Sequence, residues 1–424
     1  MTVTIKLDNL FIRIILAGLS LLLCLIFAST IFSHFLIRNI ADRRIALTLD
    51  ALNPAAKRFP GSPRVQFRLA EAEVEAAAVD PEKFPEAQAH AKIAADLSPW
   101  NYRYWRLLAL AKDAEGKTGE AADAIKVAAK LAPVNSEVNW LLGNLWLREG
   151  KPTEALKAFQ IATRTSKDLL PMAFDVAWQA FGNDVSALDT LVNGDPDAKL
   201  AQARFLVEQG QVDSAINVFR GIDSGAKLKS PSAPAFITWL IQSNRSLDAR
   251  QLWLDVVGKD TASEKGIWNS GFEQNAPRDF GHFDWSLKAS NYARIGIDRS
   301  VHRTGSKSLK LSFVGRDTTR LENEVQQLVV LKANTRYRLE CYALVANLVT
   351  PEGPRIALVG QRGMLAVSDP VAADSANWQR LVIDLAPFSE NVVANVGIVR
   401  IPKADYDDPT KGTVWFDDFK LTEQ

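Results

Sequence analysis

The sequence predicts a multidomain chain in which a single transmembrane helix is followed by an α-solenoid and then by a C-terminal antiparallel β-sandwich of the jelly-roll type. Three observations predict this order. An uncharged apolar run occupies residues 14–37, an alanine-rich pattern recurs between residues 40 and 258, and apolar residues alternate with polar ones from residue 266 to 424. A chain of 424 residues has room for about three such units.

Charge and composition exclude several classes of protein. Lys and Arg total 50 against 49 for Asp and Glu, so the net charge is +1 and no general field attracts a nucleic acid. The two cysteines, Cys24 and Cys341, lie far apart in the sequence, as do the four histidines. This spacing excludes cysteine-type zinc sites, CxxC redox centres and a disulfide framework. We expect a protein that binds other molecules, with no nucleic-acid partner and no organic cofactor.

The N-terminal region predicts a membrane anchor. After a tail at residues 1–13, the run at 14–37 contains no Asp, Glu, Lys or Arg. As a helix it is about 36 Å long, which exceeds the ~30 Å hydrocarbon core. A cleaved signal peptide is the alternative, but its apolar region is shorter, about 7–15 residues. We therefore expect an uncleaved, single-pass helix whose partner is membrane lipid, continuing helically through residues 40–54 until the FPGSP break at 59–63.

Residues 40–258 repeat with a period of about 34. Residues of similar size recur at this shift, pairing Leu108 with Leu142, Ala121 with Ala155, Ile125 with Phe159, Ala215 with Ala249 and Phe219 with Trp253. One unit between Ala155 and Ala215 is shortened or degenerate. The period and its small residues resemble tetratricopeptide repeats, which implies stacked pairs of antiparallel helices. A non-repeating helical bundle is the alternative.

Such a solenoid implies a groove for a protein partner, lined by the first helix of each pair. By register the groove positions are Arg103, Arg106, Trp140 and Asn144. Arginine and asparagine side chains there can hold a carboxylate. The alternative is that these side chains are solvated or pack between repeats. Trp140 and Leu110 stand where repeats that clamp a carboxylate carry polar residues.

The C-terminal third predicts a sheet structure. Beyond a linker at 259–265, apolar residues alternate with period two. We expect about nine short strands, seven of which can be placed at residues 308–313, 324–331, 336–341, 355–359, 379–385, 393–401 and 413–421. Cys341 lies on the alternating apolar face, which predicts a buried free thiol.

Several phrases in 266–424 resemble carbohydrate-binding modules of the galactose-binding-like, family 4/9 type. They include WNSGFEQ at 268–274, HRTGSKSLKLSF at 302–313 and GTVWFDDFKL at 412–421. The resemblance implies a structural calcium held by Glu273 with Asp417 or Asp418, against the alternative of an ordinary cluster of strand-end carboxylates. It also implies a glycan face, for which Trp285, Tyr292, Gln326 and Trp378 are candidates. Each of these is alternatively a core or rim residue.

These features together favour a membrane-anchored scaffold that docks proteins through its repeats and binds glycan through its sandwich, in bacterial cell-surface or exopolysaccharide assembly and export. The resemblance to carbohydrate modules places the bulk of the chain outside the cytoplasm, in the periplasm. One alternative is a purely protein-binding assembly factor with a structural sandwich, and another is a carbohydrate-active enzyme. No phosphate loop, serine elbow or metal–histidine spacing is present in the sequence, so we expect no catalysis.

Overall fold

A computed structural model describes residues 10–424 except 43–44, 46, 259–265, 374 and 404–408. The chain divides into two compact units, Met1–Phe205 and Leu206–Gln424. The first contains helices only, and the second contains helices followed by all of the described strands. The predicted linker at 259–265 lies outside the described residues.

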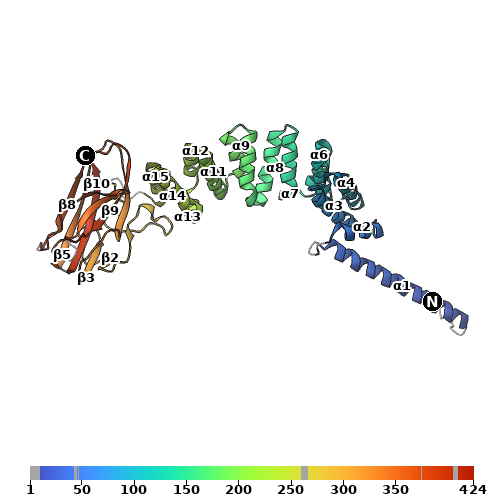
Figure 1. Cartoon of the computed structure of the whole chain (residues 1–424), viewed down its shortest axis with the longest axis horizontal. Coiled ribbons are helices and arrows are strands. Elements are labelled where there is room, and N and C mark those ends of the chain that lie inside the picture. Colours follow the sequence, from blue (N-terminus) through green and yellow to red (C-terminus); the bar gives the residue numbers. More distant parts are fainter. Residues whose placement is uncertain (1–9, 43–44, 46, 259–265, 374, 404–408) are drawn as a thin grey trace, which may run out of the picture. The chain divides into compact units, whose positions relative to one another are not determined.

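The first helix, α1 (Leu10–Ala41), contains the predicted apolar run (Figure 1). Between Arg13 and Ala41, its most apolar stretch of 18 residues has a mean hydropathy of 2.6 and is not buried, so the length and composition of this helix suffice to cross a membrane. The expected helical continuation through 40–54 is wrong. The helix ends at Ala41, and a separate helix, α2 (Leu49–Arg58), begins at Leu49. Because the two helices are separate, Ile37 and Ile40 near the end of α1 pack against the buried cluster of Leu52, Ala56, Val65 and Leu69.

Four antiparallel helix pairs follow α2 in the first unit. They are α3 (Pro63–Ala77) with α4 (Phe84–Leu97), α5 (Tyr102–Ala114) with α6 (Thr118–Leu131), α7 (Ser136–Arg148) with α8 (Pro152–Thr165), and α9 (Leu170–Ala180) with α10 (Val185–Val192). The pair α7–α8 repeats α5–α6 at the predicted period, and α10 has only 8 residues. The structure therefore confirms a helical repeat.

Local sequence explains why these helices begin, end and pack where they do. Asn101 and Asn135 cap α5 and α7 by accepting hydrogen bonds from the backbone N–H groups of Arg103 (3.1 Å) and Val138 (3.0 Å). The helix crossings are lined by small residues with no exposed surface, among them Ala109, Ala121 and Ala155. Small side chains there let the helix axes approach closely, as the repeat pattern requires.

In the second unit, α-helices precede the described strands. They are the end of α11 (Pro196–Glu208), then α12 (Val212–Arg220), α13 (Ser224–Lys229), α14 (Ser232–Gln242) and α15 (Ser246–Val257). The helices α12 and α15 carry the later repeat that the sequence predicts. Its matched members Ala215 and Ala249, and Phe219 and Trp253, are completely buried.

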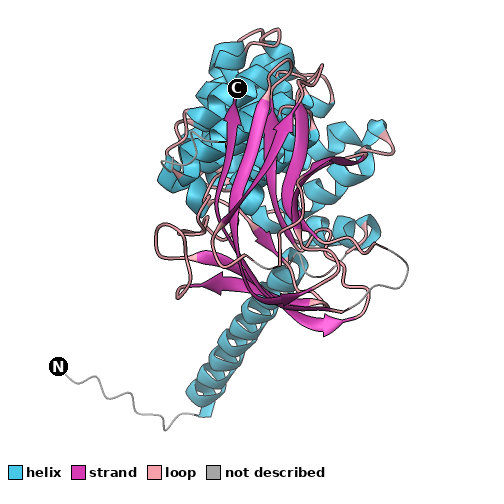
Figure 2. Cartoon of the chain, turned by 90° about the vertical axis from the view of Figure 1, so that its left-hand side faces the viewer, coloured by secondary structure: helices cyan, strands magenta, loops and turns pink. Residues whose placement is uncertain are grey.

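Two five-stranded antiparallel sheets form the sandwich (Figure 2). The first sheet runs β1 (Ser286–Leu287), β4 (Val325–Leu331), β9 (Val392–Val399), β6 (Arg355–Gly360), β7 (Gly363–Val367). The second runs β2 (Ala293–Asp298), β3 (Ser308–Arg316), β10 (Thr410–Glu423), β5 (Tyr337–Val349), β8 (Gln379–Leu385). All seven strands placed from the sequence are present, and Cys341 is a buried free thiol in the core between the sheets.

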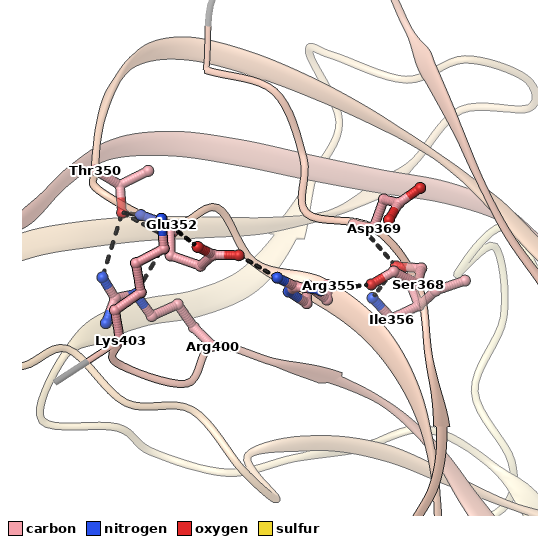
Figure 3. A network of polar contacts seen from close by, with 8 residues as sticks. All are labelled: Thr350, Glu352, Arg355, Ile356, Ser368, Asp369, Arg400 and Lys403. Atoms are coloured by element: carbon pink, nitrogen blue, oxygen red, sulfur yellow. Dashed lines mark hydrogen bonds and ion pairs between the residues drawn. The ribbon is translucent and has the colours of Figure 1, made fainter.

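A buried arginine ties together segments beside the two sheets (Figure 3). Arg400 has no exposed surface and donates to the carbonyl oxygens of Thr319 (2.7 Å) and Glu352 (3.2 Å). The Glu352 carboxylate in turn pairs with Arg355 and, at 3.1 Å, with Lys403. Burial of a charge is tolerated only where hydrogen bonds satisfy it, so this network orders the segment between β5 and β6.

The last helices pack directly on the sandwich within the second unit. Trp253 on α15 has no exposed surface, and its indole N–H donates to the carbonyl of Phe280 at 2.6 Å. Its ring contacts Trp268 edge-on at 5.2 Å, and Gln327 on β4 donates to the carbonyl of Trp268 at 2.7 Å. These contacts join α15 to the sandwich within the second unit.

Candidate functional site

The first helices of successive pairs, α3, α5 and α7, lie next to one another and carry the predicted groove positions. Arg103, in the first turn of α5, is exposed. Arg106 forms an ion pair with Glu137 of α7 at 3.2 Å. This bridge links neighbouring repeats, which leaves Arg103 as the more accessible of the two predicted cations.

The other two groove candidates are engaged in packing. The Trp140 ring lies 4.9 Å from the ring of Phe159 on α8. The side-chain amide of Asn144 donates to the carbonyl of Trp140 one turn earlier, at 2.9 Å. Both side chains are half-buried, so each retains some surface on this face. The structure places the four residues on the adjacent helices α5 and α7, and each of them has a side-chain contact within the protein.

A basic pocket that the sequence did not indicate lies at the start of this face. Its cavity volume is about 500 Å³. Six charged residues from three separate segments line it: Arg38, Asp42, Arg64, Arg68, Glu71 and Arg103. Arg68 forms an ion pair with Glu71 at 3.7 Å, whereas Arg38 and Arg64 have no carboxylate partner among the described residues. The pocket therefore carries an excess of two positive charges.

In the sandwich, the predicted calcium ligands enclose the loop between β2 and β3. The Glu273 carboxylate accepts hydrogen bonds from the backbone N–H groups of Ser306 (2.7 Å) and Lys307 (2.9 Å). Asp417 has no exposed surface and accepts from the backbone N–H groups of Arg303 (2.7 Å) and Thr304 (3.3 Å). We call this arrangement the carboxylate clasp, defined by Glu273, Asp417 and the loop 303–307.

The environment changes the acidity of both clasp carboxylates. Burial raises the pKa of Asp417 to about 6, and its hydrogen bonds only partly offset this effect. For Glu273, burial opposes ionisation, but the hydrogen bonds from Ser306 and Lys307 outweigh it and lower the pKa. Gly305 completes the clasp, because a Cβ at that position would lie 2.2 Å from the Glu273 Oε1 atom.

This geometry does not favour calcium at the three predicted ligands. N–H groups already donate to the Glu273 and Asp417 carboxylates, and Asp418 forms an ion pair with the Arg303 guanidinium at 2.6 Å. Calcium requires six to eight oxygen ligands. In the described part of the chain, no group of three or more His, Cys, Asp or Glu side chains is placed to hold a metal ion.

The four glycan candidates do not share one face. Trp285 packs against Phe419 with ring centroids 4.7 Å apart, and its indole N–H donates to the carbonyl of Asn269 at 3.0 Å. Tyr292 precedes β2 and Trp378 precedes β8, which are opposite edges of the second sheet. Gln326 lies on β4 of the first sheet, where Asn395 on β9 is a diagonal neighbour.

Comparison with known proteins finds a likeness within the helical part. Residues 110–168 match the tetratricopeptide repeat family. No curated protein matches the chain at a significant level.

Three solved structures illustrate the likeness. The MamA crystal structure is 15% identical, covering 40% of this chain and 81% of its own, with a TM-score of 0.26. YrrB, described as a TPR protein with an unusual peptide-binding site, is 15% identical over 49% of this chain and 93% of its own, with a TM-score of 0.26. TTC0263, described as a thermophilic TPR protein in Thermus thermophilus, is 16% identical over 49% and 88%, with a TM-score of 0.26. By its matched segment and its helix pairs, the chain carries tetratricopeptide-like repeats, the architecture of protein-interaction scaffolds, followed by an antiparallel sandwich.

Proposed function

We propose that this chain is a membrane-anchored scaffold that docks a protein partner on the face formed by α3, α5 and α7. The match of residues 110–168 to the tetratricopeptide repeat carries the proposal, because such repeats present a continuous surface formed by successive first helices. Exposed Arg103 and Leu110, which is 36% exposed, lie on this face. The apolar helix α1 supports anchoring in the membrane.

Site-specific photocrosslinking in the intact chain tests the docking face. A photoreactive residue at Arg103 or Leu110 on α5 is expected to give a defined adduct with a protein partner. The control positions for the photoreactive residue are Lys130 on α6 and Lys157 on α8. Both are also exposed, but they lie on the second helices of their pairs. Equal crosslinking from both sets of positions would contradict a groove on the first helices. Carbonate extraction of membranes tests the anchor independently, since an inserted chain stays in the pellet.

We further propose that the bulk of the chain is extracytoplasmic and serves cell-surface or exopolysaccharide assembly and export. The support is the resemblance of 266–424 to carbohydrate-binding modules, which act outside the cytoplasm. A reporter fused after Gln424 tests the orientation, and activity of a cytoplasm-only reporter would overturn it.

A purely protein-binding assembly factor is the second candidate, and the scattering of the four glycan candidates favours it. A sugar ring is held by an aromatic face together with amide side chains, and the amide candidate Gln326 lies on the first sheet while Tyr292 and Trp378 lie at opposite edges of the second. Affinity electrophoresis of the full chain in polysaccharide gels separates the two candidates. Retardation that is lost on Gln326→Ala supports glycan binding, whereas unchanged mobility supports the structural sandwich. We expect the wild-type chain, in which Glu273 and Asp417 are intact, to turn over no glycan.

Calcium at Glu273, Asp417 and Asp418 remains a prediction of the resemblance, and the clasp geometry predicts the opposite outcome. Because N–H donors already satisfy these carboxylates, we expect EDTA to shift the melting temperature of the full chain by less than about 1 °C, since no ligand is removed. Differential scanning calorimetry with EDTA and then with excess calcium measures this. A melting temperature that rises with calcium, and no longer rises in Glu273→Gln, would establish the metal.

A further inference from the structure

The basic pocket lies where α1 ends and the helical repeats begin. Ile37 and Ile40 of α1 pack against the buried cluster that includes Leu52, Val65 and Leu69. This packing holds the end of α1 against α2 and α3. The pocket wall that includes Arg38, Ala41 and Asp42 is thus joined to the wall provided by α3 and α5.

The position of Arg38 in a bilayer follows from the length of α1. Residues 14–37 give about 36 Å of uncharged helix, slightly more than a ~30 Å hydrocarbon core. Arg38 is the first charged residue after this run, so it falls in the headgroup layer once α1 is inserted. This step rests on the proposed membrane anchoring. The other arginines of the pocket, held next to Arg38, lie within reach of the same layer.

The charges of the pocket suit a phosphate group. Four arginines line it against two carboxylates, Asp42 and Glu71. Arg64 and Arg103 are exposed, and the Arg103 side chain donates to the hydroxyl of Tyr102 at 3.4 Å. Guanidinium groups bind phosphate oxygens through paired N–H donors. A cavity of about 500 Å³ has room for a phosphodiester with its glycerol.

A second, more apolar cavity shares Arg64 with the basic pocket. Its volume is about 530 Å³, and it is lined by His34, Ile37, Phe59, Gly61, Pro63 and Arg64 among others. A cationic pocket and an apolar pocket joined at one arginine match a ligand that has an anionic head and an apolar tail. A soluble phosphate or a peptide carboxylate would use only the basic half.

An exposed tryptophan lies beside the same pocket. Trp100 is 84% exposed and directly precedes Asn101, which lines the cavity. Tryptophan is enriched at the membrane–water interface, where its ring lies at the level of the headgroups. Full exposure of this ring is costly in water and is relieved at a lipid surface.

We propose that the pocket formed by Arg38, Arg64 and Arg103 binds the phosphate of an anionic phospholipid, with the lipid's apolar part in the adjoining cavity at Ile37 and Phe59. Bound lipid would fix the orientation of the first repeats at the membrane surface.

Native mass spectrometry of the full-length protein in detergent tests this, with phosphatidylglycerol and phosphatidylcholine added in equal amounts. The wild type is expected to retain phosphatidylglycerol preferentially. Arg38→Gln, Arg64→Gln and Arg103→Gln together should reduce that preference by about fivefold per arginine. The matched control carries Lys130→Gln, Lys157→Gln and Arg164→Gln, which removes three exposed charges from the same unit and should behave as wild type.

The outcomes separate the alternatives. Unchanged preference in the pocket variant, or an equal loss in the control, overturns the proposal. Excess glycerol 1-phosphate should leave bound phosphatidylglycerol in place, and its complete displacement would assign the pocket to a soluble phosphate. If the triple variant is not folded by circular dichroism, the single exposed change Arg64→Gln gives the same test with an expected effect of about fivefold. Carbonate extraction reports insertion separately, so loss of anchoring overturns the proposed function and loss of lipid preference alone overturns only this inference.

Discussion

Asp417 combines complete burial with hydrogen bonds from three backbone N–H groups, those of Arg303, Thr304 and Asp418. Its folded pKa of about 6 lies above the unfolded value near 3.9. Protonation therefore favours the folded state, and the stability that this group contributes is complete below about pH 4 and is lost as pH rises through 6. The difference between the folded and unfolded pKa values of Asp417 corresponds to about 3 kcal/mol of unfolding free energy.

The prediction is a change in pH dependence on replacing Asp417 with Asn, which cannot titrate. Between about pH 4 and 7, the unfolding free energy of the wild type should fall by about 3 kcal/mol relative to Asp417→Asn. Urea unfolding at several pH values measures this. Asp384→Asn is a suitable control, because that carboxylate is exposed and pairs with Arg338, which lowers its pKa. Parallel curves for wild type and Asp417→Asn would contradict the assignment.

Arg400 shows how a single buried charge orders a loop. We expect Arg400→Met to lower the unfolding free energy by about 3 kcal/mol, because the carbonyls of Thr319 and Glu352 lose their donor. Arg362→Met, in the exposed turn between β6 and β7, should change it by less than about 0.5 kcal/mol. Thermal unfolding of both variants measures the difference, and equal effects would show that the network does not stabilise the sandwich.

At the scale of elements, two neighbouring repeats pack their helix crossings with different pairs of residue sizes. In the α5–α6 pair the crossing residue is Ala109 and its counterpart is Ile125. In α7–α8 the corresponding residues are Gly143 and Phe159, and a Cβ on Gly143 would lie 2.6 Å from the Phe159 ring. The larger ring is compatible only with the smaller crossing residue.

This pairing predicts that Gly143→Ala destabilises the first unit by about 1–3 kcal/mol, even though alanine favours a helix by about 1 kcal/mol. Combining Gly143→Ala with Phe159→Ile, which recreates the neighbouring repeat, should restore most of the loss. Gly119→Ala on α6 is the control, because no atom lies within 4 Å of its added Cβ. Chemical unfolding monitored by circular dichroism tests the series, and failure of the double variant to recover would contradict the pairing.

At the scale of the whole molecule, the last helices and the sandwich belong to one unit, and Trp253 joins α15 to the segment that precedes β1. Trp253→Ala should cost about 3–5 kcal/mol and increase amide exchange both in α15 and in β4, which contacts α15. Trp239→Ala on α14, whose ring is half-buried, should increase exchange in the helices only. If Trp253→Ala leaves β4 protected, the helices and the sandwich unfold independently.

The sequence by itself determined the kind and order of the elements. Helical and strand periodicities are local, so the apolar run, the repeats and seven strands could be read within short windows. The helical continuation through 40–54 failed because Ile37 and Ile40 pack against a buried cluster that includes Val65 and Leu69 of α3, a contact that no local pattern reveals.

Only the tertiary structure decided which candidate functional side chains lie close together. Arg38, Arg64 and Arg103 are far apart in the chain and meet because α1, α3 and α5 pack together. Glu273 and Asp417 both accept hydrogen bonds from the loop at residues 303–307, and whether N–H groups or a metal satisfy them depends on the backbone path of that loop. Side-chain patterns encode which residues are buried, whereas the meeting of distant segments depends on packing of the whole unit.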